Sequence, residues 1–165
     1  MNNKYIFTEN IIKEIDLIKT KFPKDKSKSA IIESLLIIQH DNKGFLNEEL
    51  IASLASYLDV NKIDVYEVAT FYSMFNLEPV GEITISVCTN VSCMLRKSDD
   101  IVKYIEKKLK IKIGESTKDN KFYLKDEMEC LAACNGAPMM QVNHVNYENL
   151  TVEKVDQILD EIAND

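Results

Sequence analysis

Four cysteines, arranged as two close pairs, constrain the fold of this 165-residue chain more than any other feature. Cys88 and Cys93 have four residues between them, Cys130 and Cys134 have three, and the sequence contains no other cysteine. Four thiolates on two short segments suit a tetrahedral soft-metal site, because each segment supplies two sulfurs and the fold brings the segments together. The pattern predicts that Cys88, Cys93, Cys130 and Cys134 hold a metal ion or an iron-sulfur cluster.

The spacing of the cysteines leaves more than one metal open. A structural zinc site also accepts four thiolates tetrahedrally, and the first pair has a spacing that zinc sites use. A thioredoxin-type dithiol is disfavoured, because it would need two residues between its cysteines. Four inert buried thiols are disfavoured too, since inert cysteines have no reason to occur in pairs. The residues alone leave an iron-sulfur cluster and a zinc ion equally open.

The composition predicts a folded, soluble protein that does not bind nucleic acid. Hydrophobic residues make up 45% of the chain, which is enough for a packed core in one ordinary domain or two small ones. The net charge is -7, and neither half of the chain is basic. The helix-turn-helix-like stretch Leu50 to Val68 suggests a DNA-binding regulator, but its acidic surroundings disfavour that function, which a DNA-binding assay would test.

The beginning of the chain predicts a cytoplasmic location. Residues 1–9 contain no apolar stretch followed by small residues, and they already include Glu9, unlike secretory or organellar presequences. A reducing cytoplasm disfavours a disulfide framework and leaves metal binding or redox catalysis for the cysteines. The longest apolar run, Ala30 to Ile38, is interrupted by Glu33 and Ser34, so no direct membrane insertion is expected.

Residues 8 to about 78 predict a small bundle of four helices. The polar segment 42–44 closes the second helix, and Asn47 is a good N-cap for the third. Asn61 with Asp64 resembles a capping box at the start of the fourth helix. We assign residues 1–80 to a helical domain that docks to a partner. The apolar residues at helical spacing are Ile11, Ile15, Ile18, Phe22, Ile31, Leu35, Ile38, Leu50, Leu54 and Leu58.

Residues 81–165 predict a thioredoxin-like domain, which makes the whole chain α+β. The alternating residues 83–87 form a strand that runs directly into Cys88, and an amphipathic helix with an acidic start follows Ser98. Further strands are expected at 122–124, 139–142 and 145–147, before a last helix from Thr151 to about Ile162. This order is thioredoxin-like and places both cysteine pairs in loops at the same end of the sheet.

Three segments closely resemble a known family. They run from Glu67 to Leu77, from Cys88 to Cys93 and from Glu129 to Gln141. Together they are similar to the thioredoxin-like 2Fe-2S subunit of NADH:quinone oxidoreductase, the respiratory complex I. The resemblance spans almost the whole chain and includes its helical half.

The resemblance implies the site, its cofactor and its partners. In that family the four cysteines hold one 2Fe-2S cluster, so Cys88, Cys93, Cys130 and Cys134 are expected to be its ligands. The chain would be an electron-transfer subunit beside a larger flavoprotein subunit that binds NADH and FMN, with other peripheral-arm subunits as further partners. It would lie on the cytoplasmic side of the bacterial inner membrane through the complex. Diaphorase modules of NAD-linked hydrogenases and formate dehydrogenases carry the same motif and are alternative parents.

Some positions carry smaller expectations. The four glycines are too dispersed for a phosphate loop, so no independent NADH or flavin site is expected on this chain. The aromatic cluster at 71–75, with Phe71, Tyr72, Met74 and Phe75, is the candidate contact with the flavoprotein partner. We expect residues 96–97 to be solvated and the methionines at 139–140 to fill the core. Ala132 stands where the family commonly has glycine, and Asn135-Gly136 also departs from the family pattern. These two departures concern hydrogen bonds to the sulfurs rather than the ligands.

Overall fold

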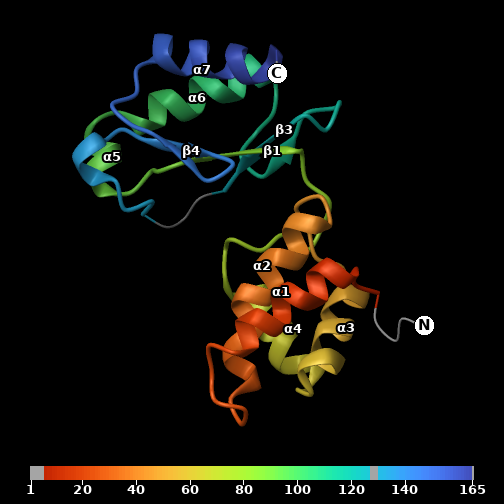
Figure 1. Cartoon of the computed structure of the whole chain (residues 1–165). Helices are drawn as coiled ribbons and strands as arrows, with labels where there is room; N and C mark the ends of the chain where they lie inside the picture. The colour runs from red at the N-terminus through yellow and green to blue at the C-terminus, as the bar shows by residue number, and fades with distance from the viewer. Residues whose placement is uncertain (1–5, 127–129, 165) are drawn as a thin grey trace. The chain divides into compact units, whose positions relative to one another are not determined.

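The structure is a computed structural model that describes residues 6–126 and 130–164 (Figure 1). Two parts of the sequence predictions lie outside the described residues. They are residues 1–5, which were used to predict the location of the protein, and Glu129, the first residue of the third segment that resembles the family. Contacts divide the chain into two units, residues 1–79 and residues 80–165. Each unit has its own hydrophobic core. The described helices include none that is long and apolar enough to cross a bilayer.

Four α-helices build the first unit over its described residues, which confirms the predicted helical bundle. Each of two helices begins at a side-chain cap: Thr8 accepts a hydrogen bond from the Ile11 N–H at 3.3 Å, and Asn47 accepts one from the Leu50 N–H at 2.9 Å. A short 3₁₀ helix, Ser27–Ala30, precedes the second α-helix. The α-helices are α1 (Glu9–Lys19), α2 (Ile31–Asp41), α3 (Glu48–Leu58) and α4 (Lys62–Phe71).

The capping box predicted at the start of α4 forms only in part. The Asn61 side chain makes no capping hydrogen bond, and its amide instead donates to the Asp64 carboxylate at 3.4 Å. Asp64 also pairs with Lys28 at 2.9 Å. The hydrogen bond from Lys28 is the main reason that the pKa of Asp64 lies below its usual value. A residue distant in sequence therefore shares the carboxylate that the local motif uses.

The apolar positions read from the sequence form the core of this unit. Ile15, Leu35 and Leu54 are fully buried, so three helices contribute to one core. Because each helix buries one stripe and is too short to be stable alone, packing of these stripes holds the bundle together.

Replacing Asn47 with alanine is expected to destabilise this bundle by about 1 kcal/mol, because the Leu50 N–H loses its acceptor at the start of α3. Urea unfolding followed by circular dichroism measures the loss. Asn61→Ala is the matched control, since the Asn61 side chain makes no capping bond and its replacement should cost less. Equal losses in the two variants would contradict the capping role of Asn47.

The second unit is built on a five-stranded sheet, as far as the described residues go. The strand order is β2-β3-β1-β4-β5, in which β1 and β3 are parallel and the other neighbours are antiparallel. The elements are β1 (Ile83–Val87), α5 (Val91–Leu95), α6 (Ser98–Leu109), β2 (Glu115–Ser116), β3 (Phe122–Lys125), a 3₁₀ helix (Cys134–Gly136), β4 (Met140–Val142), β5 (Val145–Tyr147) and α7 (Val152–Asn164). The predicted strands and long helices are confirmed, whereas α5, β2 and the 3₁₀ helix are additions.

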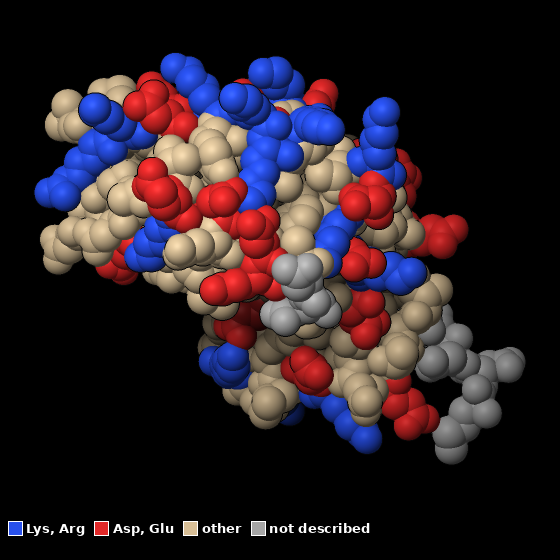
Figure 2. Space-filling model, turned by 90° about the horizontal axis from the view of Figure 1, so that it is seen from above, with Lys and Arg blue, Asp and Glu red and all other residues tan. Residues whose placement is uncertain are grey.

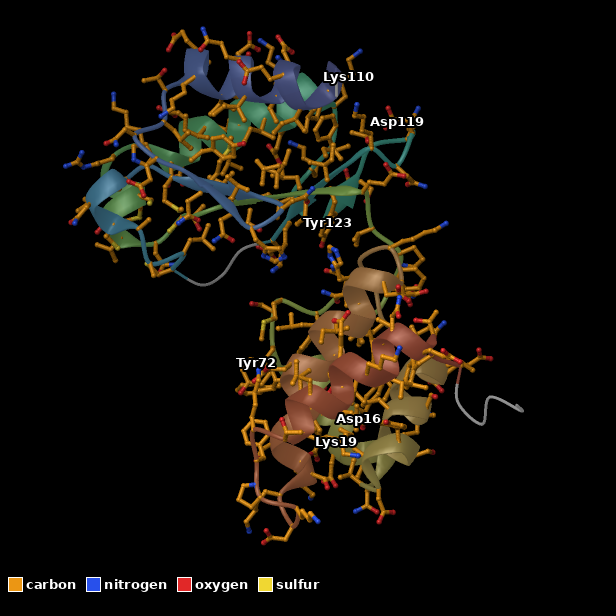
Figure 3. The ribbon with its side chains drawn as sticks, in the orientation of Figure 1. Asp16, Lys19, Tyr72, Lys110, Asp119 and Tyr123 are labelled. Carbon is orange, nitrogen blue, oxygen red and sulfur yellow. The ribbon has the colours of Figure 1, made fainter. Side chains whose placement is uncertain are left out.

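Helices α6 and α7 lie against one face of this sheet (Figure 1). Ile85, Ile105 and Leu124 are almost completely buried between the helices and the sheet. Alternate strand residues face the other way, and Figure 3 shows Tyr123 on the side of β3 away from the two helices. Lys108 joins α6 to α7 by pairing with Asp156 and, at 2.6 Å, with Asp160. One face of the sheet is thus closed by helices that are packed and also paired by charge.

The surface above α6 and α7 carries charges of both signs. Figure 2 views the molecule from this side, and its Lys, Arg, Asp and Glu side chains are interspersed. Opposite charges at close range reduce the long-range potential of a surface. The visible face therefore offers little attraction to a polyanion.

Candidate metal centre

Strand pairing brings the two cysteine segments to one end of the sheet. Cys88 directly follows β1, and the second segment connects the end of β3 to the start of β4. β1 and β3 are parallel, so their carboxyl ends lie together, while β4 is antiparallel to β1 and starts at that same end. The Cys88 N–H donates to the Met139 carbonyl at 3.1 Å, which extends the β1–β4 pairing to the cysteine itself.

The four cysteines differ in their local structure and exposure. Cys88 and Cys93 are 2% and 1% exposed, whereas Cys130 and Cys134 are exposed. The sequence placed both pairs in loops, and this was wrong for two of the four residues. Cys93 lies within α5, and Cys134 begins the 3₁₀ helix Cys134–Gly136. Both elements are only one turn long and are held by contacts from the rest of the unit, which sequence periodicity cannot reveal.

The thiols nevertheless form a continuous set of neighbours. The Cys130 and Cys134 sulfurs are 3.5 Å apart. Cys88 packs in one buried cluster with Cys93, and its thiol contributes to the lowered pKa of Cys130 in the other segment. All four residues are free of disulfide bonds. The structure therefore places the four predicted ligands at one end of the sheet.

Three protein groups act as hydrogen-bond donors that lower the pKa values of these thiols. They are the Met139 N–H beside Cys93, the Ala132 N–H beside Cys130 and the Ser92 hydroxyl beside Cys134. Donors of this kind stabilise thiolates and are typical of the surroundings of iron-sulfur clusters. The donor set thus fits an anionic, thiolate-bound centre. Among the described residues, however, no three His, Cys, Asp or Glu side chains are arranged to hold a single ion. The positions of the thiols by themselves do not identify the metal or cluster that they would bind.

The pKa values of the thiols reflect this environment. Burial raises the pKa of Cys93 to about 11, against the opposing effect of the Met139 N–H. The Ala132 N–H is the main reason that the pKa of Cys130 is lowered, with further contributions from the thiols of Cys134 and Cys88. The pKa of Cys134 is raised, chiefly by its hydrogen bond with Cys130. The exposed segment therefore carries the thiol that ionises more readily, while the buried Cys93 needs a metal to become a thiolate.

Ala132 adopts a backbone conformation that glycine adopts more easily. Its φ is 60°, in the left-handed region that residues with a Cβ avoid. This conformation turns the Ala132 N–H toward the Cys130 sulfur. In the sequence, the only sign of this unusual backbone conformation is that Ala132 occupies a position where the resemblance leads us to expect glycine.

Ala132→Gly is expected to stabilise the second unit by about 1 kcal/mol, because glycine adopts the left-handed conformation without strain. The matched control is Ala133→Gly, at a residue whose φ of -112° suits any amino acid. That substitution should destabilise the unit, since it only adds freedom to the unfolded chain. Thermal unfolding of the two variants measures the difference, and a change of the same sign in both would refute this account of Ala132.

Further contacts around the site were not visible in the sequence. Arg96 is exposed, as expected, and it also donates to the Ala137 carbonyl at 3.4 Å, just beyond the second cysteine segment. The prediction for the methionines is confirmed. Met139 is buried beside Cys88 and Cys93, and Met140 is buried in the main core of the unit. Sequence reasoning missed the donor role of Ser92, although a hydroxyl between two cysteines is a recognisable donor signal.

Helix α5 presents an exposed apolar surface next to the buried cysteines. Val91, Met94 and Leu95 are 66%, 50% and 75% exposed, and they surround Cys93 in the sequence. We call these three residues the α5 patch. Large apolar side chains grouped at a functional site are typical of a surface that contacts another molecule.

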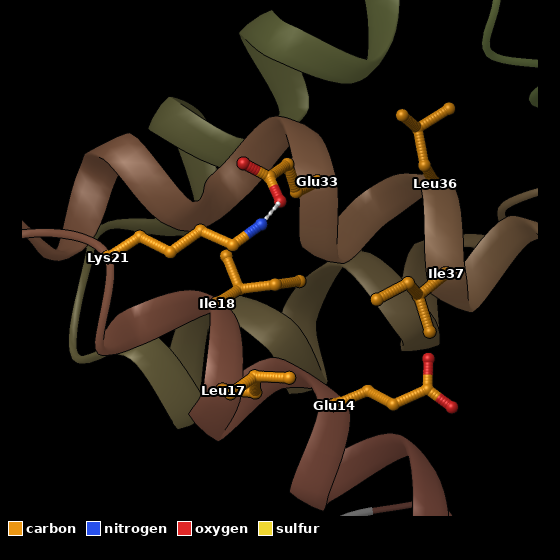
Figure 4. A pocket seen from close by; sticks show the side chains of 7 residues that line it. All are labelled: Glu14, Leu17, Ile18, Lys21, Glu33, Leu36 and Ile37. Atoms are coloured by element: carbon orange, nitrogen blue, oxygen red, sulfur yellow. Dashed lines mark hydrogen bonds and ion pairs between the residues drawn. The ribbon is translucent and has the colours of Figure 1, made fainter.

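Two cavities lie in the first unit, and no cysteine lines either of them. One, of about 340 Å³, lies between α1 and α2, where Lys21 pairs with Glu33 (Figure 4). The other, of about 740 Å³, is bordered by Tyr57, whose hydroxyl donates to Asp16 at 2.6 Å and whose ring lies beneath the ammonium of Lys19. Figure 3 labels Asp16 and Lys19. The smaller cavity is lined by Glu14, Leu17, Ile18, Lys21, Glu33, Leu36 and Ile37.

Known proteins resemble this chain over its whole length. The NADH-quinone oxidoreductase E subunit of Rickettsia felis is 44% identical over 165 residues, which cover 100% of this chain and 98% of the relative. The corresponding protein of Rickettsia bellii is 49% identical over 91% of this chain and 89% of the relative. The mitochondrial NADH dehydrogenase [ubiquinone] flavoprotein 2 of Dictyostelium discoideum is 40% identical over 96% of this chain and 64% of its own length.

A solved structure shares the fold at low sequence identity. An NAD⁺-reducing [NiFe]-hydrogenase in its air-oxidized state superimposes with a TM-score of 0.67 at 18% identity, over 79% of this chain. This chain covers only 23% of the hydrogenase chain, so the likeness concerns the fold alone. The model of the thioredoxin-like [2Fe-2S] ferredoxin family matches residues 15–163. The chain therefore belongs to the thioredoxin-like [2Fe-2S] ferredoxin family, which includes the E subunits of NADH-quinone oxidoreductase.

Proposed function

We propose that this chain is the electron-transferring E subunit of an NADH-quinone oxidoreductase, and that Cys88, Cys93, Cys130 and Cys134 hold its 2Fe-2S cluster. The observation that carries the proposal is the meeting of four free thiols with three hydrogen-bond donors at one end of the sheet. The full-length similarity to E subunits favours a cluster over the zinc alternative. When bound, the cluster accepts and releases one electron at a time.

The residues of this chain would bind the cluster and adjust its reduction potential. A centre with four thiolate ligands is negatively charged, and its charge increases on reduction. The Met139 N–H, the Ala132 N–H and the Ser92 hydroxyl place positive ends of dipoles at three different sulfurs. These donors favour the more negative state and so raise the potential. Burial of Cys88 and Cys93 limits water on the other side of the centre.

The α5 patch is our candidate surface for the flavoprotein partner. Electron transfer requires the donor to approach the cluster, and this patch surrounds Cys93 with three exposed apolar side chains. We infer that the larger subunit, carrying FMN and NADH, docks on this patch and so shields the cluster from water.

The helical unit would supply a further contact through Phe71, which is 79% exposed and stacks edge-on against Tyr72. Phe75, also a candidate contact residue, is only 7% exposed and packs in the core instead.

Complex I is the better supported parent. The similarity to complex I subunits extends over the full chain at 44% identity, whereas the hydrogenase shares 18%. Within complex I the chain would lie on the cytoplasmic side of the bacterial inner membrane, held by the flavoprotein and other peripheral-arm subunits. Diaphorase modules of NAD-linked hydrogenases or formate dehydrogenases stay the alternative.

Purified full-length protein tests the assignment. We expect a reddish-brown sample with visible charge-transfer absorption, about two irons and two acid-labile sulfides per chain, and a paramagnetic signal after one-electron reduction. Colourless protein with one zinc ion would refute the cluster and support the zinc-stabilised interaction module.

Affinity purification from cells tests the partner, since a subunit of complex I should retain a flavin-containing protein. Met94→Asp in the α5 patch should release that protein without removing iron.

A further inference from the structure

The exposed pair Cys130 and Cys134 differs from the buried pair in a way that matters when no cluster is bound. Its two sulfurs are 3.5 Å apart, and both residues are exposed. Cys88 and Cys93 are only 2% and 1% exposed. A small oxidant in solution can therefore reach one pair and not the other.

We propose that Cys130 and Cys134 form a reversible disulfide in the cluster-free chain, with a low-molecular-weight disulfide such as glutathione disulfide as the oxidant. The sulfur of one cysteine attacks glutathione disulfide, which forms a mixed disulfide and releases one glutathione. The sulfur of the other cysteine then attacks the mixed disulfide and releases the second glutathione. The two protein thiols lose two electrons and two protons, and one glutathione disulfide becomes two glutathione thiols.

The geometry favours closure within this pair. A disulfide bond is about 2.05 Å long, so the sulfurs need to approach by roughly 1.5 Å from their present separation. The left-handed Ala132 lies midway between them, and its N–H donates to Cys130, so the chain is already folded back on itself at this point. Ring closure therefore needs little rearrangement.

The consequence is a link between thiol oxidation and cluster loading. A disulfide between Cys130 and Cys134 removes two of the four proposed ligands and at the same time prevents their irreversible oxidation. Loading would then require a thiol reductant first. The disulfide itself depends only on the arrangement of the two thiols, so its formation is a separate matter from the identity of the metal.

Disulfide mapping of the full-length chain tests the proposal. The chain is freed of metal with a chelator and a reductant, equilibrated with glutathione and glutathione disulfide, quenched, alkylated, digested and analysed by mass spectrometry. We expect the Cys130–Cys134 disulfide to exceed the Cys88–Cys93 disulfide about tenfold. Comparable amounts of the two, pairs formed across the segments, or only glutathione adducts would overturn the proposal.

Denatured chain provides the matched control. In concentrated urea the two pairs close loops of nearly equal length, so the preference should disappear. A preference that persists in urea would show that local sequence, rather than the folded arrangement, causes it. Cys134→Ser gives a second control, because Cys130 should then stop at the glutathione adduct.

Metal loading provides a readout of the consequence. The oxidised chain is mixed with ferrous iron and sulfide, with or without a phosphine reductant, and bound iron is measured after gel filtration. We expect about tenfold more iron when the reductant is present. Equal loading without the reductant would overturn the link. If mapping finds the disulfide but the reduced chain binds zinc and no cluster, the proposed function fails while the disulfide stands.

Discussion

Cys93→Ser is expected to lower the iron content of the purified protein by at least about tenfold and to abolish its visible absorption. The Cys93 thiol is 1% exposed, within reach of Cys88, and receives the Met139 N–H. A serine hydroxyl is a hard, weakly acidic donor that replaces a soft thiolate poorly. Iron analysis, sulfide analysis and the absorption spectrum of equal amounts of protein measure the effect. Cys134→Ser should also reduce iron content, since it removes a ligand from the other segment.

The change should be confined to the second unit. The core of residues 1–79 is formed by residues of that unit, from Phe7 to Phe75, so the bundle should keep its hydrogen-exchange protection. Val91→Ser is the matched control, because it places a serine in the same short helix at a side chain that is 66% exposed. A Cys93→Ser protein with the full native spectrum would show that the ligand assignment is wrong.

Gly136→Ala is expected to destabilise the second unit by about 1–3 kcal/mol and to speed cluster loss about tenfold. A Cβ at this position would lie 2.5 Å from the Cβ of Glu148. The residue cannot move away freely, because its carbonyl accepts from the Asn149 N–H at 2.6 Å and its N–H donates to the Ala133 carbonyl at 3.0 Å. The strain would pass to Cys134, which lies in the same 3₁₀ turn. Bleaching of the visible absorption in the presence of an iron chelator measures the rate.

Substitution of Glu148 separates crowding from other effects of the new methyl group. Glu148→Gly removes both the carboxylate and the Cβ that the added methyl would meet, so the double variant should regain most of the lost stability. Glu148→Ala keeps the Cβ and should rescue only in part. A double variant with Glu148→Gly that bleaches as fast as Gly136→Ala alone would refute crowding as the cause.

Several local features of the fold could be predicted from the sequence because they depend on neighbouring residues. The helical spacing of Ile11, Ile15 and Ile18 reflects the buried stripe of α1. Asn47 caps α3 as expected, because the accepting side chain and the donor N–H are three residues apart. The alternation around Ile85 indicated β1 for the same reason. In each case the information needed is contained within a few consecutive residues.

Other features required contacts between distant residues. Asp64 binds Lys28 as well as Asn61, and Arg96 reaches the Ala137 carbonyl. Helix α5 is too short to give a periodic signal. The left-handed conformation of Ala132 is held against its intrinsic preference, which a sequence pattern that favours ordinary backbone angles does not predict.

The sequence by itself determined the residue types of the site, two cysteine pairs on short segments, together with the strands β1, β3 and β4 that flank those segments. Only the tertiary structure decided that Cys88 and Cys130 lie within reach of each other, and which pair is buried. The physical reason is that β1 pairs with β3 in parallel and with β4 antiparallel, which gathers both cysteine segments at one end of the sheet. Strand pairing depends on side chains far apart in the chain, whereas cysteine spacing is local.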